Sequence, residues 1–138
     1  MHRFSLFIIW TLCFVSCKKD TPKDQIQHLN GYWEIKKVIL PNGSEKDYNF
    51  SQSIDFIEIT NYTGIRKKVQ PRLDGSFITN NDSESFILII DEDSLRLHYK
   101  TTLSTWKETI ISAKENHITI KNEAGNVYFY ERYKKIEF

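Results

Sequence analysis

Cysteine, proline and glycine are all scarce in this chain, and the shortage of cysteine limits its chemistry most. The 138 residues include two cysteines, three prolines and five glycines. Cys13 and Cys17 both lie near the N-terminus, so no thiol remains further along for a disulfide, a metal site or a nucleophile. The folded part must therefore be held together by its core alone, for which the 14% aromatic content supplies bulky side chains.

Net charge and catalytic motifs are also lacking. The 19 basic residues nearly balance the 18 acidic ones, so the chain lacks the basic surface of a nucleic-acid-binding protein. No Gly-x-Ser-x-Gly or phosphate-binding loop is present, and we predict a protein that is not an enzyme. The acidic run 91–93 is too short for a calcium loop. His28, His98 and His117 do not share one element, so we predict no metal site and no cofactor.

The one long apolar run lies at the N-terminus. It covers residues 4–15, follows a positively charged start at Arg3 and ends just before Cys17, after which the sequence becomes polar. The run is shorter than the roughly 20 residues that span a bilayer, and its layout is typical of a secretory signal. It resembles the signal of bacterial lipoproteins, in which the cysteine is acylated and becomes the mature N-terminus.

That resemblance implies a signal peptide over residues 1–16, followed by a lipidated Cys17 and a flexible tether over 17–27. The protein is then anchored by acyl chains to a membrane of the bacterial cell envelope, with the outer membrane as the expected site. Removing 16 of the 138 residues leaves 122, which is the size of one domain, and it brings the formal charge close to zero. We expect that domain over residues 28–138.

From Leu29 onward the sequence predicts strands. Short segments rich in Ile, Val, Phe, Tyr and Thr are separated by clusters of Asn, Asp, Gly and Ser, and residues 95–100 alternate strictly between apolar and polar. We count about eight or nine strands and no convincing helix. Short connections favour an antiparallel meander, and closing it into an up-and-down barrel removes both exposed edges. A β-sandwich remains the alternative.

The opening Leu29-Asn30-Gly31-Tyr32-Trp33 resembles the Gly-x-Trp signature of lipocalins, and more closely the lipocalin-like domains of bacterial lipoproteins. The resemblance implies an all-β, antiparallel up-and-down meander closed into a roughly eight-stranded barrel. Gly31 would let the chain cross the closed end of the barrel, and Trp33 would plug that end. By the same resemblance, Arg132 would pack on the Trp33 ring in a cation–π contact.

A barrel of about eight strands holds either side chains or one small ligand. We predict that the lumen binds a small apolar or amphipathic molecule without catalysis. Lys67, if it faces inward, would suit a carboxylate. The other candidate ligand-binding residues are the aromatics Phe56, Phe77, Tyr99, Trp106 and Phe129. Alternatively, the domain is a structural module that binds another envelope protein through an exposed patch that includes Tyr128 and Tyr130.

Overall fold

The structure of the protein is a computed structural model that describes residues 18–135 and residue 137. The predicted signal peptide and Cys17 lie outside the described residues. One helix precedes ten strands in the described part of the chain. They are α1 (Pro22–Leu29), β1 (Gly31–Ile39), β2 (Glu45–Asp47), β3 (Ile54–Thr60), β4 (Thr63–Pro71), β5 (Phe77–Thr79), β6 (Glu84–Asp91), β7 (Ser94–Lys100), β8 (Thr105–Ala113), β9 (His117–Asn122) and β10 (Val127–Arg132).

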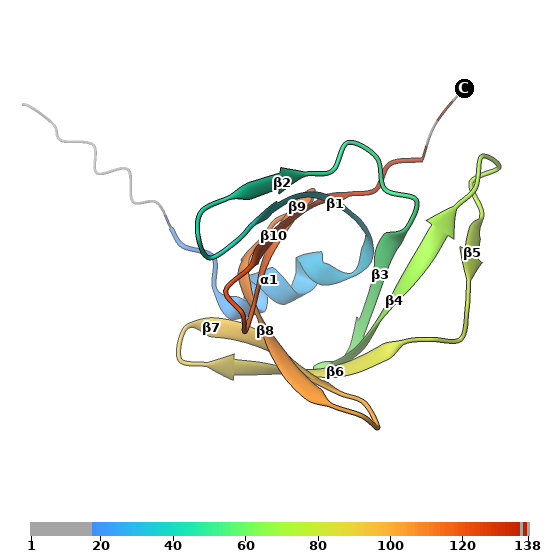
Figure 1. Cartoon of the computed structure of the whole chain (residues 1–138). Coiled ribbons are helices and arrows are strands. Elements are labelled where there is room, and N and C mark those ends of the chain that lie inside the picture. Colours follow the sequence, from blue (N-terminus) through green and yellow to red (C-terminus); the bar gives the residue numbers. More distant parts are fainter. Residues whose placement is uncertain (1–17, 136, 138) are drawn as a thin grey trace, which may run out of the picture.

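Eight of the strands form a closed antiparallel barrel. Strands β1, β3, β4, β6, β7, β8, β9 and β10 are hydrogen-bonded in that order, and β10 returns to pair with β1 from Trp33 to Ile39. Figure 1 looks into this ring of strands from one end, with α1 drawn across it. All of the pairs belong to a single sheet. The prediction of an all-β, lipocalin-like barrel is therefore confirmed, and the β-sandwich alternative is wrong.

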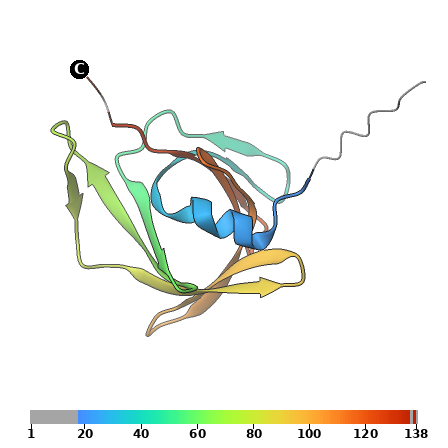
Figure 2. The same ribbon diagram turned by 180° about the vertical axis from the view of Figure 1, so that it is seen from behind.

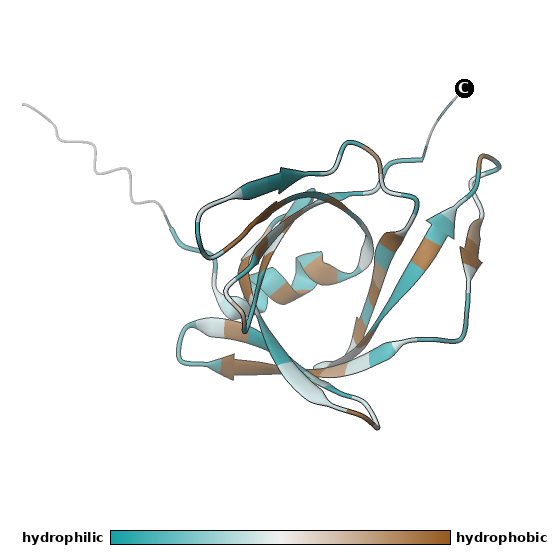
Figure 3. Ribbon diagram, in the orientation of Figure 1, coloured by the Kyte–Doolittle hydropathy of each residue, from teal (hydrophilic) through white to brown (hydrophobic). Residues whose placement is uncertain are grey.

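The two short strands lie outside this ring. β2 is entirely hydrophilic (Figure 3) and pairs with the last residues of β1. β4 pairs with β6 only between Thr63 and Arg66, and beyond that point it pairs with β5. β4 and β5 extend away from the ring in Figure 1. The barrel wall therefore opens where β4 leaves β6, and we call this end, bounded by residues 66–68 and 80–84, the mouth.

The part of the interior away from the mouth is filled with side chains. Apolar residues alternate with polar ones along the strands, as expected when one face of a sheet is buried (Figure 3). Burying each large aliphatic side chain contributes about 1.5–3 kcal/mol to stability. The buried core consists of Leu29, Trp33, Ile57, Phe86, Leu88, Leu95, Leu97, Tyr99, Ile110, Ala113, Ile118, Ile120 and Tyr130.

The helix α1 covers the end of the barrel opposite the mouth, as the reverse view in Figure 2 shows. This differs from the sequence-based expectation of a flexible tether, because residues 22–27 are helical. Thr21 and Asp24 form a capping box and Pro22 occupies the first turn, which are strong local signals for a helix start. Gln25 and Leu29 are buried, so α1 is part of the domain.

The closed end brings Gly31, Trp33 and Arg132 together. The Trp33 indole is fully buried, its Nε1 donates to the Leu29 carbonyl over 2.8 Å, and the Arg132 guanidinium lies 4.2 Å from the ring centroid. Arg132 also donates to the Asn30 carbonyl over 2.9 Å. Gly31 has φ +123°, and a Cβ there would lie 2.5 Å from an Arg132 nitrogen. The positive φ favours glycine here, and any side chain would also push the Arg132 guanidinium from its place.

Candidate functional site at the mouth of the barrel

The interior at the mouth is polar and is organised around Arg66 of β4. One guanidinium nitrogen donates to Asp55 (2.9 Å) and the Tyr130 hydroxyl (2.8 Å). The other donates to Glu108 (2.9 Å) and the Tyr99 hydroxyl (3.3 Å), and Tyr99 donates to the same Glu108 oxygen. These five side chains come from β3, β4, β7, β8 and β10, so the network joins strands from across the barrel.

Burial makes this network electrostatically strong. The side chain of Asp55 is 2% exposed and that of Arg66 is 11% exposed, so both charges have little access to water. Burial alone raises the pKa of Asp55, but Arg66 and Lys68 more than offset it and hold the pKa below its usual value. Burial also raises the pKa of Tyr99 and of Tyr130, so both hydroxyls stay protonated and available for hydrogen bonds.

A cavity of about 540 Å³ lies directly against the network and opens at the mouth. Asp55, Arg66, Glu108 and Tyr130 form its inner wall, and the exposed connection between β5 and β6 forms its rim. Its volume lies within the range of small-molecule sites, which is roughly 300–1,000 Å³. Other lining residues are Lys67, Lys68, Asn80, Asp82, Ser83, Glu84, Trp106 and Tyr128.

Two aromatic side chains give the cavity its apolar surface. Trp106 stacks on Tyr99 with a centroid distance of 4.9 Å and an interplanar angle of 5°. Tyr128 accepts hydrogen bonds from the side chains of Asn122 (3.2 Å) and Asn126 (3.4 Å). Both rings are held in place by neighbours, so they offer a rigid surface for an aromatic or aliphatic group.

Of the predicted ligand-binding residues, Tyr99 and Trp106 lie inside the barrel, whereas Phe56 and Phe77 do not. Tyr32 packs against both phenylalanines, with centroid distances of 4.8 Å to Phe56 and 4.3 Å to Phe77. Tyr32 follows Gly31 and precedes the inward-facing Trp33, so this cluster lies on the outer surface. The stacking of Tyr32 on Phe77 packs β5 against β1.

Lys67 does not point into the lumen, which corrects the expectation of an inward lysine. Its Nζ lies 5.6 Å from the centroid of Phe56, the residue paired with it on β3. Arg66 and Lys68 face inward instead, because both contact Asp55. Lys67 borders the cavity only at its rim.

On β10, too, the side chains face the opposite way from the prediction. Phe129 lies on the outer surface with the Lys37 ammonium 4.9 Å from its ring centroid. Tyr128 and Tyr130, which the alternative hypothesis placed in an exposed patch, both face the interior. That patch is therefore not available to a protein partner.

The sequence-based prediction missed Asp55, Arg66 and Glu108, the three charged members of the network. One signal was present, because alternation places Asp55 on the same face of β3 as Ile57 and Ile59. A carboxylate that shares a face with two isoleucines is buried together with them, and it then needs a buried cation as a partner.

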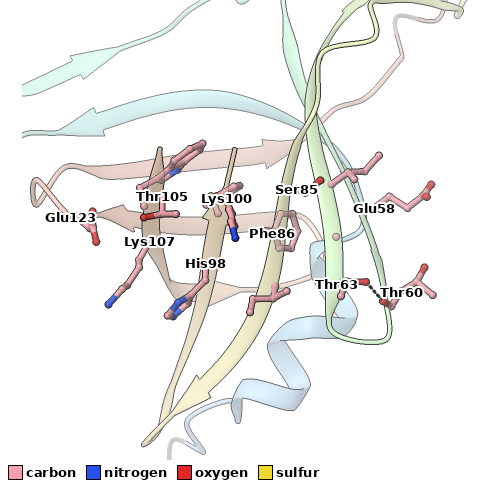
Figure 4. A pocket seen from close by; sticks show the side chains of 15 residues that line it. Glu58, Thr60, Thr63, Ser85, Phe86, His98, Lys100, Thr105, Lys107 and Glu123 are labelled. Carbon is pink, nitrogen blue, oxygen red and sulfur yellow. Dashed lines mark hydrogen bonds between the residues drawn. The ribbon is translucent and has the colours of Figure 1, made fainter. Parts of the chain in front are cut away.

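A second concave region lies on the outer surface of the barrel, across β3, β4, β6, β7 and β8 (Figure 4). This outer groove has a volume of about 690 Å³. Two rows of directly paired residues cross the five strands and line it. One row consists of Thr60, Thr63, Ile87, His98 and Lys107, and the other consists of Glu58, Ile65, Ser85, Lys100 and Thr105.

Neither a metal-binding cluster nor a helix long enough to span a membrane is found among the described residues. No group of three or more His, Cys, Asp or Glu side chains is placed to hold a metal ion within residues 18–135. In the same part of the chain, α1 is far too short to cross a bilayer, and no other helix is present that could do so.

An antiparallel barrel with a helix across one end and a polar cavity at the other defines a lipocalin-type protein. The family comparison agrees, since the model of the lipocalin-like domain family matches residues 29–135. The chain belongs to this family.

Two solved structures resemble the fold. A lipocalin-like protein from Bacteroides uniformis is 7% identical, with 77% of this chain and 99% of that chain covered and a TM-score of 0.49. An uncharacterized protein from Bacteroides eggerthii is 9% identical, with 75% and 98% covered and a TM-score of 0.48. No curated protein matches the sequence.

Proposed function

We propose that this protein is a lipid-anchored lipoprotein of the bacterial cell envelope whose barrel binds a small amphipathic molecule at the mouth without changing it chemically. The cavity of about 540 Å³ against the Arg66 network carries the proposal. The rest of the lumen is occupied by the core, so the space for a ligand lies at the mouth.

The lining favours an amphipathic ligand over a purely apolar one. Trp106 and Tyr128 offer aromatic surface, whereas Lys68, Asn80 and Asp82 offer polar groups near the opening. The charge on Arg66 is already balanced by Asp55 and Glu108, so it forms a fixed floor for the cavity. An apolar portion of the ligand would lie against the two rings, and its polar portion would remain at the rim.

Binding at the mouth is testable with anilinonaphthalene sulfonate, an amphipathic aromatic probe. We expect saturable binding to the full-length protein, with energy transfer from Trp106. The variant Ser83→Trp places a large side chain on the exposed rim and should weaken binding about tenfold, equivalent to about 1.4 kcal/mol. Fluorescence titration against a blank of lipid alone provides the measurement.

Two control variants separate the mouth from other surfaces. Asp93→Trp adds the same bulky ring to the exposed β6–β7 turn, which does not line the mouth cavity, and should leave binding unchanged. Ile87→Asp alters only the outer groove and should also have no effect. Equal weakening by Ser83→Trp and Asp93→Trp would contradict a site at the mouth.

The membrane anchor is a separate part of the proposal, supported by the resemblance of residues 1–17 to a lipoprotein signal. Two or more acyl chains make membrane residence stable, whereas a single chain gives only reversible binding. We expect full-length protein expressed in a bacterium to sediment with membranes and Cys17→Ala to shift to the soluble fraction. Cys13→Ala is the matched control and should sediment like the wild type. Membrane residence of Cys17→Ala would contradict acylation at this position.

A further inference from the structure

The outer groove has an apolar centre, a basic end and an acidic end, and it lies outside the mouth cavity described above. Ile65 and Ile87 form its centre, and Ile87 is 48% exposed. Ile65 lies diagonally across β4 and β6 from Ile87, so the two side chains form one apolar patch in a concave surface, and such patches mark binding sites. Thr63 and Ser85 lie beside the two isoleucines, so the centre is apolar with small flanking hydroxyls.

One end of the groove is cationic. Lys107 lies directly opposite His98, and Lys100 lies on the same strand as His98, two residues further on. Neither Lys100 nor Lys107 has an ion-pair partner within 4.0 Å among the described residues. Glu123 borders this end and reduces its formal charge to +1 with histidine neutral. The basic end is therefore free to bind an anion.

The opposite end is acidic. Glu58 lies on β3, three strands away from Lys100 in the row of paired residues that runs through Ile65 and Ser85. Figure 4 shows Glu58 at one side of the groove and Lys100 and Lys107 toward the other. With neighbouring strands about 4.8 Å apart, five strands span roughly 19 Å. The length and the charge gradient together suit a linear molecule that has one anionic end.

The geometry points to a second binding site in the outer groove, for a free single-chain carboxylate amphiphile such as a long-chain fatty acid. Its chain lies across Ile65 and Ile87, and its carboxylate lies at Lys100 and Lys107. Glu58 sets the direction, because a carboxylate at that end would meet a like charge. This site differs from the mouth cavity, since neither isoleucine lines the mouth, although Trp106 borders both.

The test uses hexadecanoate that carries a photoactivatable diazirine, with the full-length protein and peptide mapping by mass spectrometry. We expect labelling of peptides from β4, β6 and β7. Ile87→Asp should reduce labelling about tenfold, which corresponds to loss of the burial of one isoleucine side chain. Ile111→Asp is the matched control, because Ile111 is 49% exposed on β8 and lies outside the groove, and it should leave labelling unchanged.

The head group is tested with Lys100→Gln combined with Lys107→Gln. The wild type should be labelled more strongly by the acid than by its neutral methyl ester. In the double variant, labelling by the acid should fall about fivefold, whereas labelling by the ester should not change. Three results would overturn the proposal. They are equal loss in Ile111→Asp, labelling confined to Ser83 and Tyr128 at the mouth, and labelling only by a diazirine phospholipid from the surrounding bilayer.

Discussion

Replacing Arg66 with methionine should lower the free energy of unfolding by about 3–5 kcal/mol, because it leaves a buried carboxylate without its main partner. Asp55 would keep only the Lys68 ammonium, which lies 2.6 Å from its Oδ1 but on a side chain that is 65% exposed, so water screens this remaining ion pair more than it screens the pair with Arg66. Glu108 would lose its ion pair as well. Urea denaturation of the purified protein at neutral pH, followed by circular dichroism, measures the loss.

The neighbouring variant Lys67→Met is the matched control. It removes the same kind of charge from the adjacent position, but its ammonium lies outside the barrel over Phe56. We expect Lys67→Met to lower the free energy of unfolding by less than about 1 kcal/mol, as is usual when an exposed charge is removed. Equal losses for Arg66→Met and Lys67→Met would show that the two side chains face the interior to a similar extent, against the structure.

The pH dependence gives this prediction a second readout. Because the pKa of Asp55 is lowered in the folded state, its stabilising contribution is present above the unfolded pKa of about 3.9 and is lost as pH falls further. In Arg66→Met, burial without the main partner should raise the pKa of Asp55 instead. Acidification then protonates Asp55 and removes the cost of burying its unpaired charge. The difference in free energy of unfolding between Arg66→Met and the wild type should therefore shrink from pH 7 to pH 4. A constant difference would contradict the buried ion pair.

Truncating Trp33 to alanine should also lower the free energy of unfolding by about 3–5 kcal/mol, the usual cost for a large buried aromatic. The ring is fully buried, donates a hydrogen bond to Leu29 at the end of α1 and lies under Arg132. Its removal leaves a cavity and releases the helix from the closed end of the barrel. Urea denaturation gives the total loss, and amide hydrogen exchange of α1 shows whether the helix opens first.

Trp33→Phe separates packing from hydrogen bonding at this site. It keeps most of the aromatic contact with the core and with Arg132 and loses only the indole donor. We expect a cost of about 1–3 kcal/mol, since the Leu29 carbonyl is left without that bond in a buried setting. A Trp33→Ala variant as stable as Trp33→Phe would show that the ring does not plug the barrel.

The strands and their closure were predictable because their signals are local. Turn residues at short spacing and strict alternation in segments such as 95–100 specify strands and short connections, and exposed edges favour closure. The Gly-x-Trp opening and a basic residue on the last strand led to Gly31, Trp33 and Arg132, which lie in contact. The helix was missed although its capping box was readable, because residues 18–27 were interpreted from their polar composition alone.

The direction of the side chains at the mouth was not predictable by alternation. On β4, Val69 is buried on the outer surface, where it pairs with the equally buried Ile54, while Arg66 and Lys68 face inward. Alternation specifies two faces but not which of them is the interior, and here both are covered. At the mouth, the face of β4 that points into the barrel carries the charged side chains Arg66 and Lys68, and the opposite face carries the buried Val69. This is the reverse of the usual arrangement, in which the apolar face of a strand points into the barrel. Phe129 was misplaced on β10 in the same way.

The most direct test of a ligand site at the mouth is native mass spectrometry of the full-length protein, extracted from its own membrane in mild detergent. We expect the wild type and Ile87→Asp to carry a mouth ligand of one constant mass, and Ser83→Trp to be strongly depleted of it. A fatty acid in the outer groove would show the opposite pattern, retained by Ser83→Trp and lost from Ile87→Asp. A wild-type protein that carries no such molecule, or a Ser83→Trp variant that carries the same one, would contradict the proposed site.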